Sequence, residues 1–331
     1  MSRAVSLLLT LALPAIVLVL TPVALSAEPP AVFEGKTARQ WADQLEKSKV
    51  DDIRTRWYAT YALGQMGPQA GEVVGVLHTV LDEIPNNEYV RGNAAWALGR
   101  IGAKAEPEIP FLTEKMRTTT LLSVRRNTVE ALGNLGPAAK PSVGELVKML
   151  GNEDTVTRVN AAVALWQIDH HAKAVPALIE LLRSGAAPGP YQAAVALGRL
   201  GAEPDHAAAA LIDALRQSDA DVRRAAARSI GQLGRAAFAA LKDKKALDDP
   251  DEQVRSLVVE AVGWMGAEGV NPLIKALEDK SPAVRRAAAR ALGRLGPEAK
   301  AAEPALVDVV SDAKEEVRDA AAKALRRIRA E

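Results

Sequence analysis

Apolar residues recur along this chain in a nine-residue frame, Arg-x-x-Ala-Ala-x-Ala-Leu-Gly, which returns at intervals of about 33 residues. The clearest copies read ADVRRAAARSIGQLG and PAVRRAAARALGRLG. On a helix the two alanines and the later Ala-Leu pair fall on one arc, and the second and sixth positions fall opposite that arc. Each frame therefore predicts an amphipathic helix whose alanine-rich face is buried.

A second apolar helix is predicted after each frame, with spacing such as that of Leu178 and Leu181. Between the two helices stands a Gly-x-x-Gly step, as from Gly293 to Gly296, which we expect to end the first helix because glycine accepts positive φ. With no strand pattern, two helices per unit predict an all-α fold. We expect an α-solenoid of about nine helical hairpins over residues 51–331.

The sequence predicts a cap for the N-terminal end of the solenoid and a side-chain cap at the start of its first helices. Residues 28–50 are predicted to form an N-terminal cap helix, in which Trp41 and Leu45 lie on one face and cover the first repeat. Each first helix is expected to begin at a side chain that accepts a hydrogen bond from the backbone. These predicted capping residues are Asp52, Asn87, Asp154, Asp219, Asp251 and Ser281.

The frame and its flanking residues resemble HEAT repeats, specifically the short phycobilisome-lyase HEAT-like form, whose pattern looks like Asp-x-x-Val-Arg-x-x-Ala-Ala-x-Ala-Leu-Gly-x-Leu-Gly. The resemblance covers residues 51–329. The segment GKTARQWADQL is similar to a cap helix common in exported bacterial proteins of this type. The resemblance implies a superhelical scaffold and is nearly silent on activity, because such repeats occur in scaffolds, adaptors and a few enzymes.

Residues 1–27 have the layout of a secretory signal peptide. Arg3 precedes an apolar run over residues 4–20, and small residues follow it. An uncleaved membrane anchor is the alternative, because the run approaches the roughly 20 residues that span a bilayer. Pro14 interrupts the run and favours cleavage. We therefore expect an exported protein, periplasmic or secreted, which contacts a membrane only if this segment stays attached.

The charge balance argues against a nucleic-acid partner. The chain has 42 Lys and Arg residues against 41 Asp and Glu residues, for a formal net charge of +1, whereas sequence-independent phosphate binding needs clustered cations. It has no cysteine, which excludes disulfides, thiolate metal sites and a cysteine nucleophile. We therefore expect stability to come from packing alone.

The chain shows no motif for catalysis, a metal or a cofactor. None of the four histidines is followed by Glu, so the paired His-Glu motifs of the HEAT-like deoxyhypusine hydroxylases are missing. The dipeptide His170-His171 replaces a glycine turn and lacks a third ligand at metal spacing. Carboxylate pairs such as Asp51-Asp52 fall at helix starts, where capping explains them.

The first position of the frame is Arg in all repeats but one, where it is Pro190. We expect these arginines to pair with aspartates of the neighbouring repeat, such as Asp154, Asp219 and Asp251, and so to form a structural ladder. An anion-binding strip is the alternative. The ladder residues are Arg56, Arg91, Arg125, Arg158, Arg223, Arg255, Arg285 and Arg318.

Two sets of residues are predicted to bind a partner. The first consists of apolar side chains at outward positions of the first helices, Trp96, Val163, Tyr191 and Val195, which indicate a docking or self-association surface. In the first repeat the cap segment could instead fold over Trp57 and Tyr61. The second set lies on the second helices, which we expect to form the inner surface: Glu108, Lys115, Glu145, Lys148, Lys173 and Glu180.

These patterns together predict a non-catalytic scaffold or adaptor that binds another protein outside the cytoplasm, without a cofactor. The alternative is an activity resembling that of the bilin lyases that share these repeats, namely chromophore handling or a chaperone-type role. The predicted signal peptide argues against it. The partner, the process and the oligomeric state do not follow from the sequence.

Overall fold

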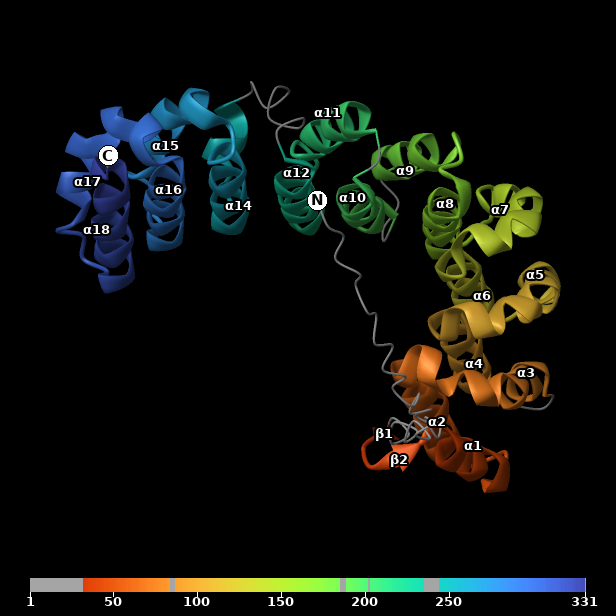
Figure 1. Cartoon of the computed structure of the whole chain (residues 1–331). Coiled ribbons are helices and arrows are strands. Elements are labelled where there is room, and N and C mark those ends of the chain that lie inside the picture. Colours follow the sequence, from red (N-terminus) through yellow and green to blue (C-terminus); the bar gives the residue numbers. More distant parts are fainter. Residues whose placement is uncertain (1–31, 84–86, 185–188, 202, 235–243, 331) are drawn as a thin grey trace, which may run out of the picture.

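The computed structural model describes residues 32–83, 87–184, 189–201, 203–234 and 244–330. The predicted signal peptide, residues 1–27, lies outside this part of the chain. Within it, helices of two kinds alternate along a curved row, and the prediction of an all-α solenoid is confirmed (Figure 1).

The first helices, which carry the frame, are α2 (Ile53–Met66), α4 (Glu88–Ile101), α6 (Leu122–Asn134), α8 (Thr155–Asp169), α10 (Gly189–Leu200), α12 (Ala220–Leu233), α14 (Glu252–Val262), α16 (Pro282–Leu295) and α18 (Glu315–Arg329). The second helices are α3 (Val74–Asp82), α5 (Ile109–Thr118), α7 (Val143–Met149), α9 (Ala174–Arg183), α11 (Pro204–Ala214), α15 (Val270–Ala276) and α17 (Glu303–Val309). Short 3-10 helices occupy Gly67–Val73, Gly102–Glu108, Gly136–Ser142, Lys244–Asp248, Gly266–Gly269 and Gly296–Ala302.

The N-terminal end of the row is closed by an antiparallel hairpin and one helix: β1 (Val32–Phe33), β2 (Lys36–Thr37) and α1 (Ala38–Lys47). Helix α1 packs against α2, with Trp41 and Leu45 buried in the core. The Trp41 indole N–H donates to the Phe33 carbonyl at 3.1 Å, which ties the hairpin to the helix. The sequence pattern does not indicate the hairpin, because strands of two residues are too short to show alternation.

Side-chain caps begin most first helices. Asp52, Asn87, Asp154, Asp219 and Asp251 each accept a backbone N–H in the first turn, as predicted. The prediction for Ser281 is wrong. Its hydroxyl has no hydrogen-bond partner in the described chain, while its backbone carbonyl accepts the N–H groups of Val284 and Arg285, both at 3.1 Å.

The two glycines of each Gly-x-x-Gly step have different roles. The second one ends the helix with a positive φ, as at Gly296 with φ 59°. The first one, expected to do the same, stands three residues earlier, and at most steps it lies at the contact with the next first helix. A Cβ on Gly99 would stand 2.5 Å from the Ala131 Cα, and one on Gly293 would stand 2.9 Å from the Ala324 Cα. These glycines therefore allow consecutive first helices to approach closely.

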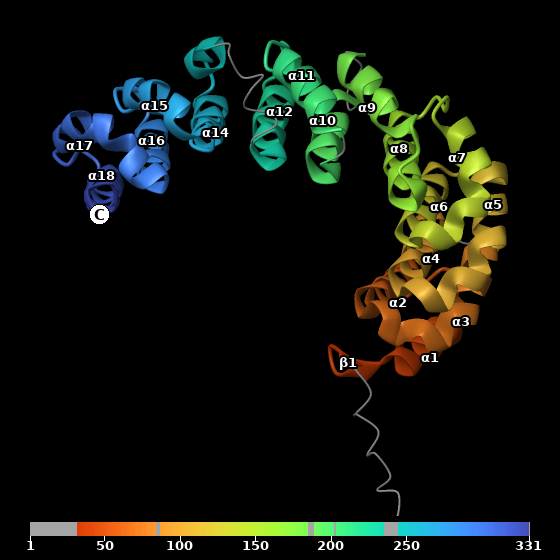
Figure 2. The same cartoon turned by 45° about the horizontal axis from the view of Figure 1, so that its top comes forward.

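The curvature places the first helices on the inside of the arc. Figures 1 and 2 show the even-numbered helices lining the concave side and α3, α5, α7, α9 and α11 lying outside. The expectation that the second helices form the inner surface is therefore wrong. Alanine and glycine at the contacts between first helices take up less width than the leucines of the second helices, so the row bends toward the first helices.

Candidate functional site: the concave face

The concave face is built from the second and sixth positions of each frame and from the residue directly after the frame, which we count as its tenth position. These positions are four residues apart, so on a helix they form one stripe, opposite the buried alanine-rich face. In the N-terminal half the stripe carries large apolar side chains, and toward the C-terminus it becomes cationic. The apolar members are Trp57, Tyr61, Trp96, Val163, Tyr191 and Val195.

Three of these side chains form an aromatic stack on α2 and α4. The Tyr61 ring lies between Trp57 and Trp96, with centroids 5.4 and 5.9 Å away and ring planes within 4° and 6° of parallel. The Arg100 guanidinium stands 6.0 Å from the Trp96 ring centroid. Phe33 meets Tyr61 edge-on at 6.4 Å, so the cap segment touches the stack, but Trp57 remains 39% exposed.

A hollow of about 420 Å³ lies further along the same face, between α8 and α10. Val163, Tyr191 and Val195 line it, and Tyr191 is 46% exposed. Three of the four residues predicted at a docking surface thus meet in one place, while Trp96 belongs to the aromatic stack. Val159, at the second position of the same frame as Val163, is buried, because the core continues past it into α10.

Glu130 on α6 lies between these two apolar sites and also lines the hollow. Part of its side chain is exposed. The surrounding residues bury the carboxyl enough to raise its pKa, whereas Arg199 and Arg100 lower that pKa. Both arginines occupy the tenth frame position, which the sequence analysis did not single out, although a spacing of four residues from the sixth position would have indicated it. The site therefore combines apolar surface with one carboxylate flanked by cations.

The C-terminal part of the concave face is cationic. Arg286, Arg290 and Arg294 follow one another on α16 at steps of four residues, and Lys323 and Arg327 do so on α18. They line a hollow of about 490 Å³ between the two helices. We call these five residues the basic cluster.

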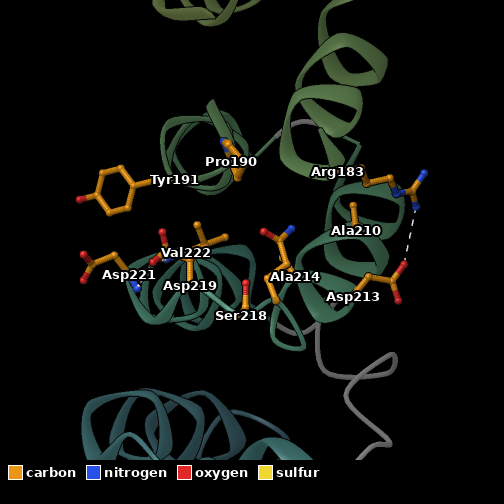
Figure 3. A pocket seen from close by; sticks show the side chains of 11 residues that line it. Arg183, Pro190, Tyr191, Ala210, Asp213, Ala214, Ser218, Asp219, Asp221 and Val222 are labelled. Atoms are coloured by element: carbon orange, nitrogen blue, oxygen red, sulfur yellow. Dashed lines mark hydrogen bonds and ion pairs between the residues drawn. The ribbon is translucent and has the colours of Figure 1, made fainter. Parts of the chain in front are cut away.

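A further hollow, about 770 Å³, lies at the seam between α9–α10 and α11–α12. Figure 3 shows Arg183 directed at Asp213 on one side, 3.6 Å away, and Tyr191 and Asp221 on the other. Asp219 caps α12 by accepting two backbone N–H groups. The charged groups of this hollow thus already have partners, since Asp221 also pairs with Arg224 at 2.8 Å.

The frame arginines of the C-terminal half form bidentate pairs with aspartates of the next repeat. In each pair Nε donates to one carboxylate oxygen at 2.7–2.8 Å and Nη2 donates to the other at 2.9–3.2 Å. The backbone carbonyl of the same aspartate accepts Nη1 of the following arginine at 2.8–2.9 Å. The result is a continuous ladder of Arg223, Asp249, Arg255, Asp279, Arg285, Asp312 and Arg318.

The prediction that Asp154, Asp219 and Asp251 are the ladder partners is wrong. They cap helices instead, because each is the last residue before a helix start, while the ladder aspartates come two residues earlier in the turn. Asp251 also pairs with Arg224, and this hydrogen bond lowers the pKa of the Asp251 carboxyl to about 2.

The frame arginines of the N-terminal half bind mainly backbone carbonyls, and no aspartate ladder is present there among the described residues. Arg91 donates to the Leu81 carbonyl at 2.9 Å. The other contacts are Arg56 to Glu83 and to the Leu45 carbonyl, Arg125 to the Thr119 carbonyl, and Arg158 to Glu180 at 3.8 Å. Arg91 and Arg125 therefore fasten their first helices to the end of the second helix of the preceding repeat.

The second-helix residues predicted to bind a partner lie on the convex side, and most of them are paired. Glu108 lies 2.5 Å from His78 Nδ1, and Glu145 lies 2.7 Å from Lys148. Lys115 pairs with Asp82, Glu180 faces Arg158, and Lys173 is exposed. Their predicted place on the inner surface is wrong, because the more closely packed first helices occupy that side.

Within the described ranges, no group of three or more His, Asp or Glu residues is arranged to hold a metal ion. His170 ends α8 in the left-handed conformation and meets Trp166 edge-on at 4.6 Å. It thus takes the place of the glycine found in other repeats. None of the described helices is long and apolar enough to cross a membrane.

A curved row of helical hairpins is an α-solenoid. The model of HEAT repeats matches residues 40–132, 109–198, 208–272 and 270–331. The chain therefore belongs to the HEAT repeat family. A comparison with curated proteins gave no match.

Solved structures with a similar fold include importin beta, crystallised in an ammonium sulfate condition, with a TM-score of 0.58 and 15% identity over 88% of this chain and 45% of that one. A Kap121p mutant gives a TM-score of 0.57 and 13% identity over 88% of this chain and 37% of that one. The chain thus spans less than half of these two proteins. Human deoxyhypusine hydroxylase gives 22% identity over 88% of this chain and 95% of that one, but a TM-score of only 0.34.

Proposed function

We propose that this protein is a non-catalytic scaffold that binds a segment of another protein on the concave face of its N-terminal half. The observation that carries the proposal is the apolar strip formed by the aromatic stack and the hollow between α8 and α10. Aromatic side chains presented in a groove are typical anchors of protein interfaces, since they bury much area at small entropic cost.

The composition of the strip supports a polypeptide partner. Aromatic residues make up 4% of the chain, yet three of them stack side by side on α2 and α4 and a fourth, Tyr191, opens the next hollow. Glu130, flanked by Arg100 and Arg199, adds a carboxylate that can accept backbone N–H groups of a bound segment. Apolar anchors next to a few polar groups give a binding site both affinity and orientation.

The test is crosslinking and affinity capture of the mature protein from its native envelope, with the crosslinked peptides identified by mass spectrometry. Trp57→Glu and Tyr191→Glu are expected to reduce capture of the partner about tenfold or more, as loss of a central anchor does. Val307→Glu on the convex helix α17 is the matched control, because Val307 and Tyr191 are both 46% exposed. Equal capture by all three variants, each with an unchanged melting temperature, would remove the proposal.

We further propose that the protein acts outside the cytoplasm and has the phycobilisome-lyase type of repeat. The first part rests on the layout of residues 1–27, and the second on the frame and its period of about 33 residues. Intact-mass analysis of the exported protein tests the location, and retention of residues 1–27 would contradict cleavage. Chromophore handling stays a prediction, and a change in visible absorbance on mixing with an open-chain tetrapyrrole would support it.

A further inference from the structure

The basic cluster concentrates positive charge on one stretch of the concave face. Its arginines and lysine share a single hollow between α16 and α18, where Glu316 and Asp319 are the acidic lining residues. Arg286, Arg290 and Lys323 are exposed. The chain as a whole has a net charge of only +1, so this excess is local.

Among the described residues, the cations of the cluster are not held in ion pairs. The neighbouring Arg285 is held by both carboxylate oxygens of Asp312. By contrast, no member of the cluster makes an ion pair with a carboxylate anywhere in the described chain. Burial lowers the pKa of Arg294, Glu260 opposes this shift, and Arg290 adds to it. Holding like charges together without counterions costs free energy, which an anionic ligand would recover.

An exposed aromatic ring extends the cluster. Trp264, in the turn after α14, is 55% exposed, and the Arg294 guanidinium stands 5.2 Å from its ring centroid. The same guanidinium donates to the Glu260 carbonyl at 3.3 Å. Arg294 is therefore held in place from two sides, and the cluster offers an apolar surface next to its charges.

The shape and the charge pattern favour a polypeptide over other anions. The cluster lies between α16 and α18, which stand on the concave side of the row (Figure 2), and a concave surface fits a flexible chain better than a flat membrane. Glu316 and Asp319 interrupt the positive charge along α18, so a continuous phosphate backbone would meet repulsion there. Separate carboxylates on a flexible chain can instead reach individual guanidinium groups and bind each one bidentately.

We infer that the basic cluster binds an acidic segment, rich in Asp and Glu, of the partner protein. This inference rests on the proposed function in one respect, since it places the segment on the same concave face. The apolar strip then contacts one part of the partner, and the basic cluster contacts an acidic part toward the C-terminus of the solenoid.

The test uses the mature protein and a fluorescent poly-glutamate peptide, with binding followed by anisotropy. Arg290→Glu combined with Lys323→Glu is expected to weaken binding at least tenfold, and added salt is expected to weaken binding to the unchanged protein. Lys275→Glu combined with Lys300→Glu is the matched control, because it makes the same charge change on exposed residues of α15 and of the 3-10 helix after α16. Thermal melting shows whether each variant is folded.

Three outcomes would overturn the inference. The first is equal weakening in the two double variants, and the second is no binding of poly-glutamate to the unchanged protein. The third is stronger binding of single-stranded DNA or of phosphatidylglycerol vesicles than of poly-glutamate. None of them touches the proposed function, which depends on Trp57 and Tyr191. Conversely, if substitution of those two residues did not change capture of the partner, the proposed function would be removed, while poly-glutamate binding could still be observed.

Discussion

Arg255 donates from Nε and Nη2 to the two carboxylate oxygens of Asp279, at 2.8 and 2.9 Å, and so joins α14 to the turn before α16. Arg255 is buried, and its Nη1 also donates to the Asp249 carbonyl at 2.8 Å. This pair is the central step of the ladder between Arg223 and Arg318. It ties the repeat that begins with α14 to the repeat that begins with α16.

We predict that Asp279→Ala destabilises the C-terminal repeats by about 3–5 kcal/mol, because it leaves the buried Arg255 guanidinium without its counterion. Guanidinium chloride unfolding measures the change, and the double variant Arg255→Ala/Asp279→Ala gives the coupling energy of the pair. Lys275→Ala is the control. It removes a largely exposed ion pair with Asp248, whose atoms lie 3.4 Å apart, and should lower the free energy of unfolding by less than about 1 kcal/mol. A similar loss in the control would contradict this prediction.

Gly99→Ala is predicted to destabilise the protein by about 1–3 kcal/mol, because the added methyl group would press on the Ala131 backbone and force α4 and α6 apart. Gly75→Ala in α3 is the matched substitution at an open position, where no atom lies within 4 Å of the new Cβ. It should stabilise by about 0.5–1 kcal/mol, as alanine does in an exposed helix. Thermal melting of both variants measures the two changes in stability. If both variants were stabilised, or both destabilised, close packing would be excluded as the reason for Gly99.

Trp41→Ala is predicted to loosen the N-terminal repeats and leave the far end intact. The indole is buried between α1 and α2 and holds the hairpin through Phe33, so its removal should cost about 3–5 kcal/mol locally. Solenoid repeats contact only their neighbours. Hydrogen exchange should therefore accelerate in α2 but not in α16. Trp264→Ala serves as the control for an exposed indole, and uniform acceleration along the whole chain would refute local coupling.

Acid is predicted to weaken the solenoid through its paired aspartates. Hydrogen bonds from Arg126, Arg224 and Arg285 lower the pKa values of Asp154, Asp251 and Asp312, respectively. A carboxyl with a lowered folded pKa stabilises the fold above its unfolded pKa, which is about 3.9 for aspartate. Since the pKa of Asp251 is about 2, that contribution should fade as pH drops from about 4 toward this value.

Melting curves between these pH values test the prediction, with Asp251→Asn as the variant. Asparagine still caps α14 through its side-chain oxygen but no longer titrates. Its stability should therefore fall less steeply with acid than that of the unchanged protein. Asp308→Asn, which changes an exposed carboxylate on α17, should reproduce the original slope. An unaltered slope in Asp251→Asn would show that its pairing with Arg224 does not contribute to the pH dependence.

Local features of this protein follow from the sequence by itself. The frame repeats an alanine-rich face at helical spacing, so the helices and the solenoid were predictable from the sequence. The capping role of Asp52 or Asp251 depends on backbone groups only two or three residues away. The positive φ of Gly296 likewise depends on its own turn.

Contacts across repeats were decided by the tertiary structure. Both Asp249 and Asp251 lie close enough in sequence to pair with an arginine, and only the rotation of one repeat against the next assigns Asp249 to Arg223 and Asp251 to Arg224. The same holds for the binding surface. Which helices line the concave side depends on the difference in packing width between the first and the second helices, summed over many repeats. No single residue encodes that difference, and so the sequence pattern did not indicate it.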